Sequence, residues 1–298
     1  MMDPVLMLQA MAAFMLSVGY CWLVGSLIAR RWLVGRAGGG DAVRQLRTFD
    51  LWASGLAIVG ALLVLMAGAA AMSGLPLADA YQALLPMLGT DFGRTGCVVL
   101  LALIALFGLR WFAPSGAWWS VELGGLLLLT FARASMGHAG EAGLLTATHV
   151  MEALHLASIG AWLGIVLVSA GPALAPSAPM VVDGGDANRY LARMSDAAMV
   201  AVLVVAVTGA YNGWHRIGSV GALLPANGYV MALTVKLSMV AVALCLGGFN
   251  KLFGLPMVVR DPRAQTTVRA LLQIEAVVLL AALFAASWLT ILAPPTAA

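Results

Sequence analysis

The residues with the clearest potential for chemistry lie in one apolar stretch, HVMEALHLASIGAWLG, at positions 149 to 164. His149, Glu152 and His155 fall within two helical turns, and the chain has only four histidines. Ionisable groups inside a membrane helix are costly and are usually functional. A helix separates His149 from His155 by about 9 Å along its axis and about 120° around it, so the two do not chelate one ion as an i, i+4 pair would. A metal site here needs ligands from other helices.

Two further groups of residues are candidates for such a site. Met7, Met11 and Met15 are spaced by four and form one stripe on a helix. Thioether sulfur suits Cu(I), and imidazole suits copper in both oxidation states, so a methionine stripe beside histidines predicts a copper site. We predict His138, His149 and His155 as the primary ligands, with Glu152 as a ligand or as a partner that orients an imidazole; possible additional ligands are His215, Met136 and Glu141.

Simpler explanations exist for several of these residues. A methionine stripe at helical spacing is more often packing or lipid contact. His149 and Glu141 could be solvated at the membrane surface, and His215, next to Trp214, could be an interfacial anchor. Lys236 and Glu275 are the other intramembrane charges, and we expect them on a polar path through the bundle.

The elements that must position these residues are membrane helices. The chain has 298 residues, of which 62% are hydrophobic and only 10% charged, a balance that a soluble domain of this size does not show. We predict an all-α polytopic membrane bundle with about eight transmembrane helices. The predicted spans are 4–28, 50–72, 95–112, 118–136, 147–170, 192–214, 228–250 and 268–292.

Two segments between the spans are distinct. Residues 74–94 are too polar and too rich in Pro and Gly to span, and are predicted to form an interfacial helix or loop. Residues 171–188 form the longest Pro/Gly-rich linker. They divide the chain into a five-span part, 1–170, with the His/Glu/Met cluster, and a three-span part, 189–298.

The distribution of Lys and Arg predicts the orientation. With the N-terminus outside, 12 of the 16 basic residues fall in inward loops, three fall outward and Lys236 lies within a span. The positive-inside rule therefore places both termini in the periplasm. All four histidines then lie within about two turns of the outer face. The basic residues sit in short loops, so nothing indicates nucleic acid as a partner.

Several separated motifs resemble the CopD family of copper-resistance membrane proteins. They occur in the family's order and cover about residues 130 to 295 well: Gly137–His138–Ala139, Leu154–His155 with Trp162–Leu163–Gly164, Arg189 to Ser195 with Thr208–Gly209, Tyr229 to Lys236 with Asn250–Lys251, and Glu275 with Pro294–Pro295. The chain departs from the family pattern in three places. Glu152 replaces a common Asp, Ile165 replaces a glycine, and a histidine like His215 is often absent.

The resemblance implies a non-enzymatic protein of the bacterial inner membrane that moves copper inward from the periplasm, beside a soluble periplasmic copper-binding protein of the CopC type. The chain has no GxxxxGK[ST] motif, so we expect any transport to be passive or ion-coupled. Two alternatives stay open. The histidines could ligate a b-type haem near the outer face, or the chain could be a non-transporting partner of a periplasmic copper carrier.

Overall fold

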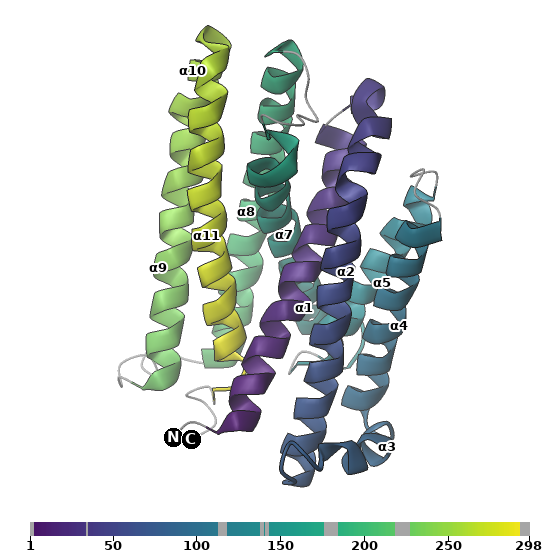
Figure 1. Ribbon diagram of the computed structural model, residues 1–298. Helices are drawn as coiled ribbons and strands as arrows, with labels where there is room; N and C mark the ends of the chain where they lie inside the picture. Colours follow the sequence, from purple (N-terminus) through teal and green to yellow (C-terminus); the bar gives the residue numbers. More distant parts are fainter. Residues whose placement is uncertain are drawn as a thin grey trace.

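The computed structural model describes residues 3–33, 35–112, 118–137, 140, 143–175, 184–217 and 227–292. Over these residues the chain is helical, with no strand (Figure 1). The α-helices are α1 (Pro4–Ile28), α2 (Gly35–Ser73), α3 (Leu84–Met87), α4 (Asp91–Phe112), α5 (Trp119–Ser135), α7 (Ala147–Val168), α8 (Gly184–Ile217), α9 (Gly228–Phe249), α10 (Leu255–Arg260) and α11 (Gln265–Leu289). The shorter turns are η1 (Ala29–Leu33), η2 (Ala80–Ala83), η3 (Ser169–Ala173), η5 (Asn250–Gly254) and η6 (Pro262–Ala264).

The predicted class, an all-α polytopic membrane bundle, is confirmed. Among the described residues, seven helical segments are long and apolar enough to cross a membrane, and they contain α1, α2, α4, α7, α8, α9 and α11. The remaining predicted span is α5, whose 17 residues lie at the lower limit for a crossing. In Figure 1 α5 runs beside α4, and α1 begins at the end of the bundle where α11 finishes. Which side of the membrane this end faces stays a prediction.

Several helices extend beyond the predicted spans. α2 has 39 residues and α8 has 34, so both include segments that were predicted as loops. At 1.5 Å per residue α2 is about 58 Å long, whereas the hydrocarbon layer is about 30 Å thick. A hydropathy pattern detects only the part of a helix that lies in hydrocarbon, so it misses such extensions. The predicted non-spanning segment 74–94 contains η2 and α3, which pack against α2.

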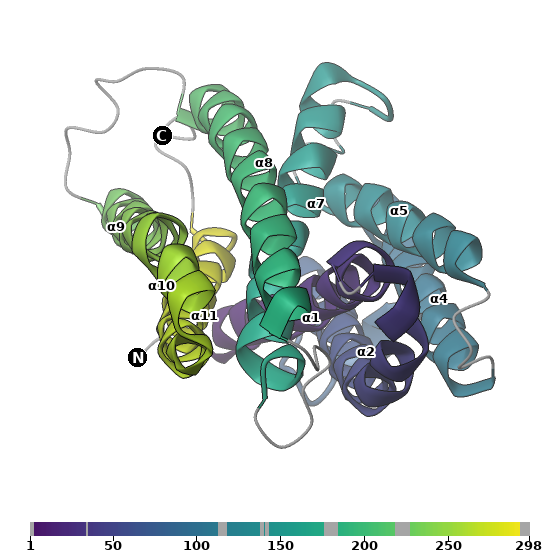
Figure 2. The ribbon, with the colours of Figure 1, turned by 90° about the horizontal axis from the view of Figure 1, so that it is seen from above.

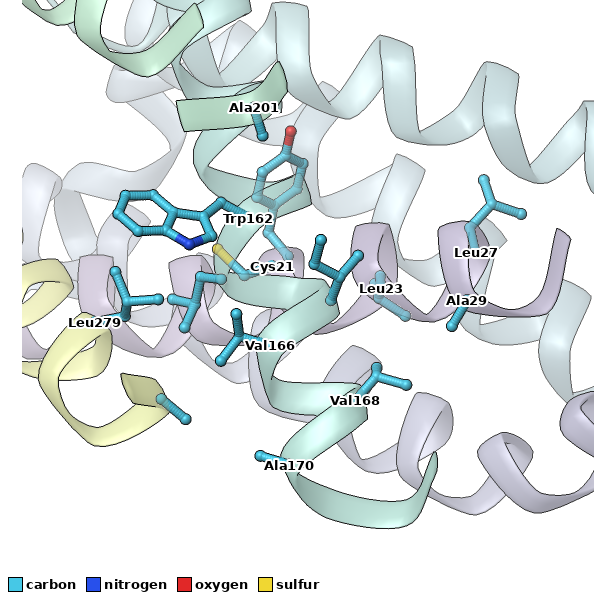
Figure 3. Close-up of a cluster of buried hydrophobic side chains, with 14 of the residues drawn as sticks. Cys21, Leu23, Leu27, Ala29, Trp162, Val166, Val168, Ala170, Ala201 and Leu279 are labelled. Carbon is cyan, nitrogen blue, oxygen red and sulfur yellow. The ribbon is translucent and has the colours of Figure 1, made fainter. Parts of the chain in front are cut away.

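α1 is the central helix of the bundle. It packs against α2, α5, α7 and α11, and it lies among them when the bundle is seen from above (Figure 2). Its closest neighbour is α7: a Cβ atom added to Gly25 would overlap the backbone of Gly164, and one added to Gly164 would overlap the carbonyl of Cys21. The apolar core continues around this contact through Trp162, Val166 and Leu279 (Figure 3). Two glycines therefore set the distance between α1 and α7.

A buried network of four charges ties α1, α2, α4 and α5 together at the predicted inner end. Arg30 donates to both carboxylate oxygens of Glu122, at 2.6 and 3.2 Å, and lies 3.7 Å from Asp50. Arg110 donates to Asp50 at 2.5 Å, and the Trp22 indole donates to the other oxygen of Asp50 at 3.0 Å. The two arginines and the two carboxylates neutralise one another, and buried charges are tolerated only when they are paired in this way. The sequence placed Arg30 and Arg110 in inward loops; instead they are buried, at 3% and 2% exposure.

The contact between α1 and α7 is directly testable with a matched pair of glycines. Gly164→Ala forces the two backbones apart, and overpacking of this kind costs about 1–3 kcal/mol. Gly108 lies in α4 with nothing within 4 Å of an added Cβ, so Gly108→Ala is expected to stabilise the protein by roughly 0.5–1 kcal/mol. Thermal unfolding in detergent measures both changes. Equal midpoints for the two variants would contradict the close contact.

Candidate functional site

α7 carries the predicted site and is held at both ends. The Thr146 side chain caps its start by accepting from the backbone N–H of His149. After Val168 the helix widens into η3, where Gly171 is non-helical and Pro172 follows. The carbonyls of Ala170 and Gly171 accept from Gln273 and Arg269 of α11, both at 3.3 Å. Within a bilayer such freed carbonyls need protein donors, so α11 fixes the inner end of α7.

His149 faces α5. The side chain is 1% exposed, and its Nε2 lies 2.8 Å from the Ser135 hydroxyl and 3.2 Å from the Phe131 carbonyl. A carbonyl oxygen only accepts, so a hydrogen bond to Phe131 requires the ring proton on Nε2. Nδ1 is then a bare acceptor nitrogen, and it is buried without a hydrogen-bond partner. Metal-ligating histidines commonly have this arrangement, with the second nitrogen donating to a carbonyl.

His155 faces α8 instead. Its Nδ1 lies 2.9 Å from the Thr208 hydroxyl, and that hydroxyl donates its own proton to the Val204 carbonyl at 2.6 Å. Thr208 therefore accepts from His155, which places the ring proton on Nδ1 and the lone pair on Nε2. The two histidines contact different helices, in agreement with the separation of about 120° expected from their spacing.

Glu152 joins His155 in a set of polar side chains between α7 and α8, with Lys236 of α9 nearby. Its Oε2 accepts from the Asn212 amide at 2.9 Å and from Arg216 at 3.2 Å. Lys236 lies close enough to interact electrostatically with Glu152, Arg216 and His155. We call this set the outer polar cluster; its members are Glu152, His155, Thr208, Asn212, Arg216 and Lys236. It holds two cationic side chains and one carboxylate.

A second arginine borders this cluster from α5. Arg133 donates to Ser17 of α1 at 2.7 Å, and its guanidinium lies 5.0 Å from the centre of the Tyr20 ring. The Tyr20 hydroxyl in turn shares a hydrogen bond of 2.7 Å with Thr130. Arg133 also interacts electrostatically with Glu152, so a third cationic side chain lies near this carboxylate.

The sequence contained a signal for the missed members of the cluster. Thr208, Asn212 and Arg216 are spaced by four, so they line one face of α8. A polar stripe with this spacing inside an apolar span indicates a face turned toward other polar groups. Thr208 belongs to one of the motifs that resemble the CopD family, whereas Arg216 lies beyond the end of the predicted span 192–214.

The other predicted ligands lie apart from the outer polar cluster. Met7 and Met11 are 46% and 45% exposed on α1, whereas Met15 is partly buried. Met136 extends toward Gly96 of α4. His215 is exposed, and its ring contacts that of Tyr211 at a tilt of 49°, with ring centres 4.5 Å apart.

The predictions for His138 and Glu141 fall outside the described residues. Across the residues that the structure does describe, no group of three or more His, Cys, Asp or Glu side chains could hold a metal ion. A complete ligand set is therefore not assembled from these residue types within the described part of the chain.

Glu275 occupies a separate buried position on α11. It is 2% exposed and accepts from the Trp162 indole of α7 at 3.2 Å. On α9 the missing side chain of Gly247 leaves room for its carboxyl group. Trp162 follows His155 by seven residues, or about two turns, so the two side chains lie on nearly the same face of α7. α7 therefore interacts with both predicted intramembrane charges: with Lys236 electrostatically, through Glu152 and His155, and with Glu275 through the hydrogen bond from Trp162.

These features define a multi-span helical membrane protein with ionisable groups buried along one helix. Residues 1–147 match the family model described as copper resistance protein D-like, N-terminal domain, and residues 188–289 match the model described as copper resistance protein D. The chain belongs to the CopD family and is a copper resistance membrane protein. No curated protein and no solved structure matches it. The division into parts 1–170 and 189–298 stays a prediction.

The charge balance of the outer polar cluster leads to a stability prediction. Glu152→Gln removes the carboxylate that faces Arg216 and Lys236, and leaves these cations to repel one another. We expect a loss of about 1–2 kcal/mol, less than for a fully buried pair because Arg216 is 39% exposed. Adding Lys236→Met to this variant should recover part of the loss. Strictly additive effects in thermal unfolding of the single and double variants would show that the two groups are not coupled.

Proposed function

We propose that this protein is a copper-binding permease of the bacterial inner membrane that moves copper inward from the periplasm. The observation that carries the proposal is the state of the two histidines of α7. Hydrogen bonds hold Nε2 of His149 and Nδ1 of His155, and Nδ1 of His149 is buried without a hydrogen-bond partner. A histidine with a purely structural role contributes most to stability when both ring nitrogens are hydrogen-bonded. An imidazole with one nitrogen bonded and the other unpaired therefore favours a role as a metal ligand.

The two histidines serve as successive binding positions in this proposal, because they face different helices. His149, with His138 and Glu141 as partners from the preceding segment, receives copper near the outer face. His155, with Glu152, binds it about 9 Å deeper along α7. Met7, Met11 and Met15 supply soft ligands for arriving copper, and Lys236 and Glu275 border the path further on. A soluble CopC-type protein would deliver the metal.

The charges favour Cu(I) as the transported species. Arg216 and Lys236 both lie near Glu152 in the outer polar cluster, and each repels a divalent ion more strongly than a monovalent one. Imidazole and thioether ligands also suit Cu(I). Metal analysis of purified protein, with the visible spectrum of the same sample, tests the ligand. Bound copper without a Soret band supports the proposal, whereas stoichiometric iron with a Soret band would assign the histidines to haem.

Removing the deeper histidine should impair both binding and uptake. His155→Ala deletes a ligand, and we expect copper affinity to fall at least about tenfold, together with copper accumulation in cells. His215→Ala is the matched control, because this histidine is exposed and its ring contacts only that of Tyr211 among the aromatic rings of the described residues. Unchanged affinity and uptake in His155→Ala would exclude this residue from the mechanism. Flux in proteoliposomes without a partner protein separates a permease from a non-transporting copper carrier subunit.

A second variant pair tests the orientation of the His155 ring without removing it. A Cβ atom at Gly209 would lie 3.1 Å from Cε1 of His155, so Gly209→Ala pushes the ring by a few tenths of an ångström. Gly213, one turn further along α8, has nothing within 4 Å of an added Cβ. We expect Gly209→Ala to weaken copper binding severalfold and Gly213→Ala to leave it unchanged, as measured by chelator competition. Equal affinities would contradict a fixed His155 ligand.

A further inference from the structure

Glu275 is a buried carboxyl group at the junction of α7, α9 and α11. The indole N–H of Trp162 is its hydrogen-bond donor, at 3.2 Å. Gly247 of α9 leaves the space that the carboxyl group occupies, since an added Cβ would lie 3.2 Å from Oε1. The side chain is 2% exposed, so water outside the bundle does not solvate it.

No cation faces this carboxyl group among the described residues. Cys21 of α1 lies in the same core cluster as Trp162 and is an uncharged thiol (Figure 3). On α11 itself, Arg269 donates to the carbonyl of Gly171, and at the inner end of α9 Lys251 lies 3.5 Å from Asp196. The groups that act on Glu275 are the surrounding apolar atoms and Trp162.

An ionised carboxylate in these surroundings is unfavourable. Burying an unpaired charge in a medium of low dielectric costs several kcal/mol, and one indole N–H does not offset that cost. The uncharged acid is therefore the resting form, with a proton on one carboxyl oxygen. The charge is tolerated only when a cation comes close, because opposite charges attract strongly where water is absent.

Polar groups continue from Glu275 toward the predicted inner side. Asn250, the first residue of η5, lies three residues beyond Gly247 and about one turn deeper. It is 3% exposed, and neither its amide nitrogen nor its amide oxygen has a hydrogen-bond partner. A buried amide with both atoms unpaired is rare and requires an explanation. Asn250 thus adds an unpaired donor and an unpaired acceptor one turn from Gly247, toward the predicted inner side.

We propose that Glu275 is a proton-binding site and that copper and a proton occupy it alternately. When Cu(I) approaches from His155, the carboxyl O–H bond breaks, the proton leaves toward the outer side, and the carboxylate balances the charge of the ion. When copper moves on to the inner side, the carboxylate takes up a proton from that side, so one proton moves outward for each Cu(I) that moves inward. The coupling to copper rests on the proposed function; the protonated state of Glu275 does not.

The test uses full-length protein in proteoliposomes with an imposed pH gradient. For one proton per copper, an interior that is about one pH unit more acidic than the exterior drives protons outward and should raise steady-state copper accumulation about tenfold, and the reverse gradient should lower it. Glu275→Gln should lose this response to the gradient, whereas Glu275→Asp, which keeps an ionisable group, should retain it. A wild-type response that is absent or opposite in sign, or a full response in Glu275→Gln, overturns the exchange.

Infrared spectroscopy provides a readout that does not depend on transport. Wild-type protein at neutral pH should show the C=O stretch of a protonated carboxyl group, Glu275→Gln should lack it, and Trp162→Phe, which removes the N–H donor, should shift it. If the wild-type protein neither binds nor moves copper but shows this band, the proposed function fails and the proton site stands. If no band is lost in a folded Glu275→Gln protein, the proton site is wrong.

Discussion

The close contact between α1 and α7 is the constraint on which the rest of the structure depends. Lipid tails are as apolar as leucine, so helices in a bilayer associate through close packing and internal hydrogen bonds rather than through the hydrophobic effect. Gly25 and Gly164 allow the two backbones to touch. The rotation of α7 is thereby fixed. Three polar side chains that recur every seven residues then meet hydrogen-bonding partners on neighbouring helices: His155 on α8, Trp162 on α11 and Ser169 on α8. A larger residue at either glycine would move the helix that carries these groups.

The protein buries charge in three different ways. At the inner end, Arg30, Glu122, Asp50 and Arg110 form a neutral, closed network in which each carboxylate is bonded to an arginine. Such a network joins helices and has little capacity to bind an additional ion. In the outer polar cluster Glu152 lies near both Arg216 and Lys236, and no cation among the described residues faces Glu275. Burial of charge without a neutral, closed network is unfavourable for stability, and these are the two positions to which our proposals assign a mobile ion or proton.

The membership in the copper resistance protein D family agrees with the chemistry of α7. Its two histidines lie at different depths and are bonded to different helices, and Nδ1 of His149 is buried without a hydrogen-bond partner. In the proposed function they are successive sites with few ligands, an arrangement that suits an ion that must be released again, whereas a complete cage of ligands suits storage. The exposure of Met7 and Met11 fits packing against lipid as well as contact with arriving copper. The two functions are compatible, because thioether side chains adapt to both.

The sequence by itself determined the class of protein, the approximate spans and the separation of His149 from His155 around one helix, because hydrophobicity and the 3.6-residue period are local properties. It also identified Glu152, Glu275 and Lys236 as costly groups. Only the tertiary structure decided what these groups contact. The positive-inside pattern assigned Arg30 and Arg110 to inward loops, but both are buried in ion pairs. The polar stripe of α8, which contains Thr208, Asn212 and Arg216, becomes part of a cluster only where α8 meets α7. The reason is physical: the cost of burying a charge depends on the residue alone, whereas its compensation depends on a partner that is up to about a hundred residues away along the chain.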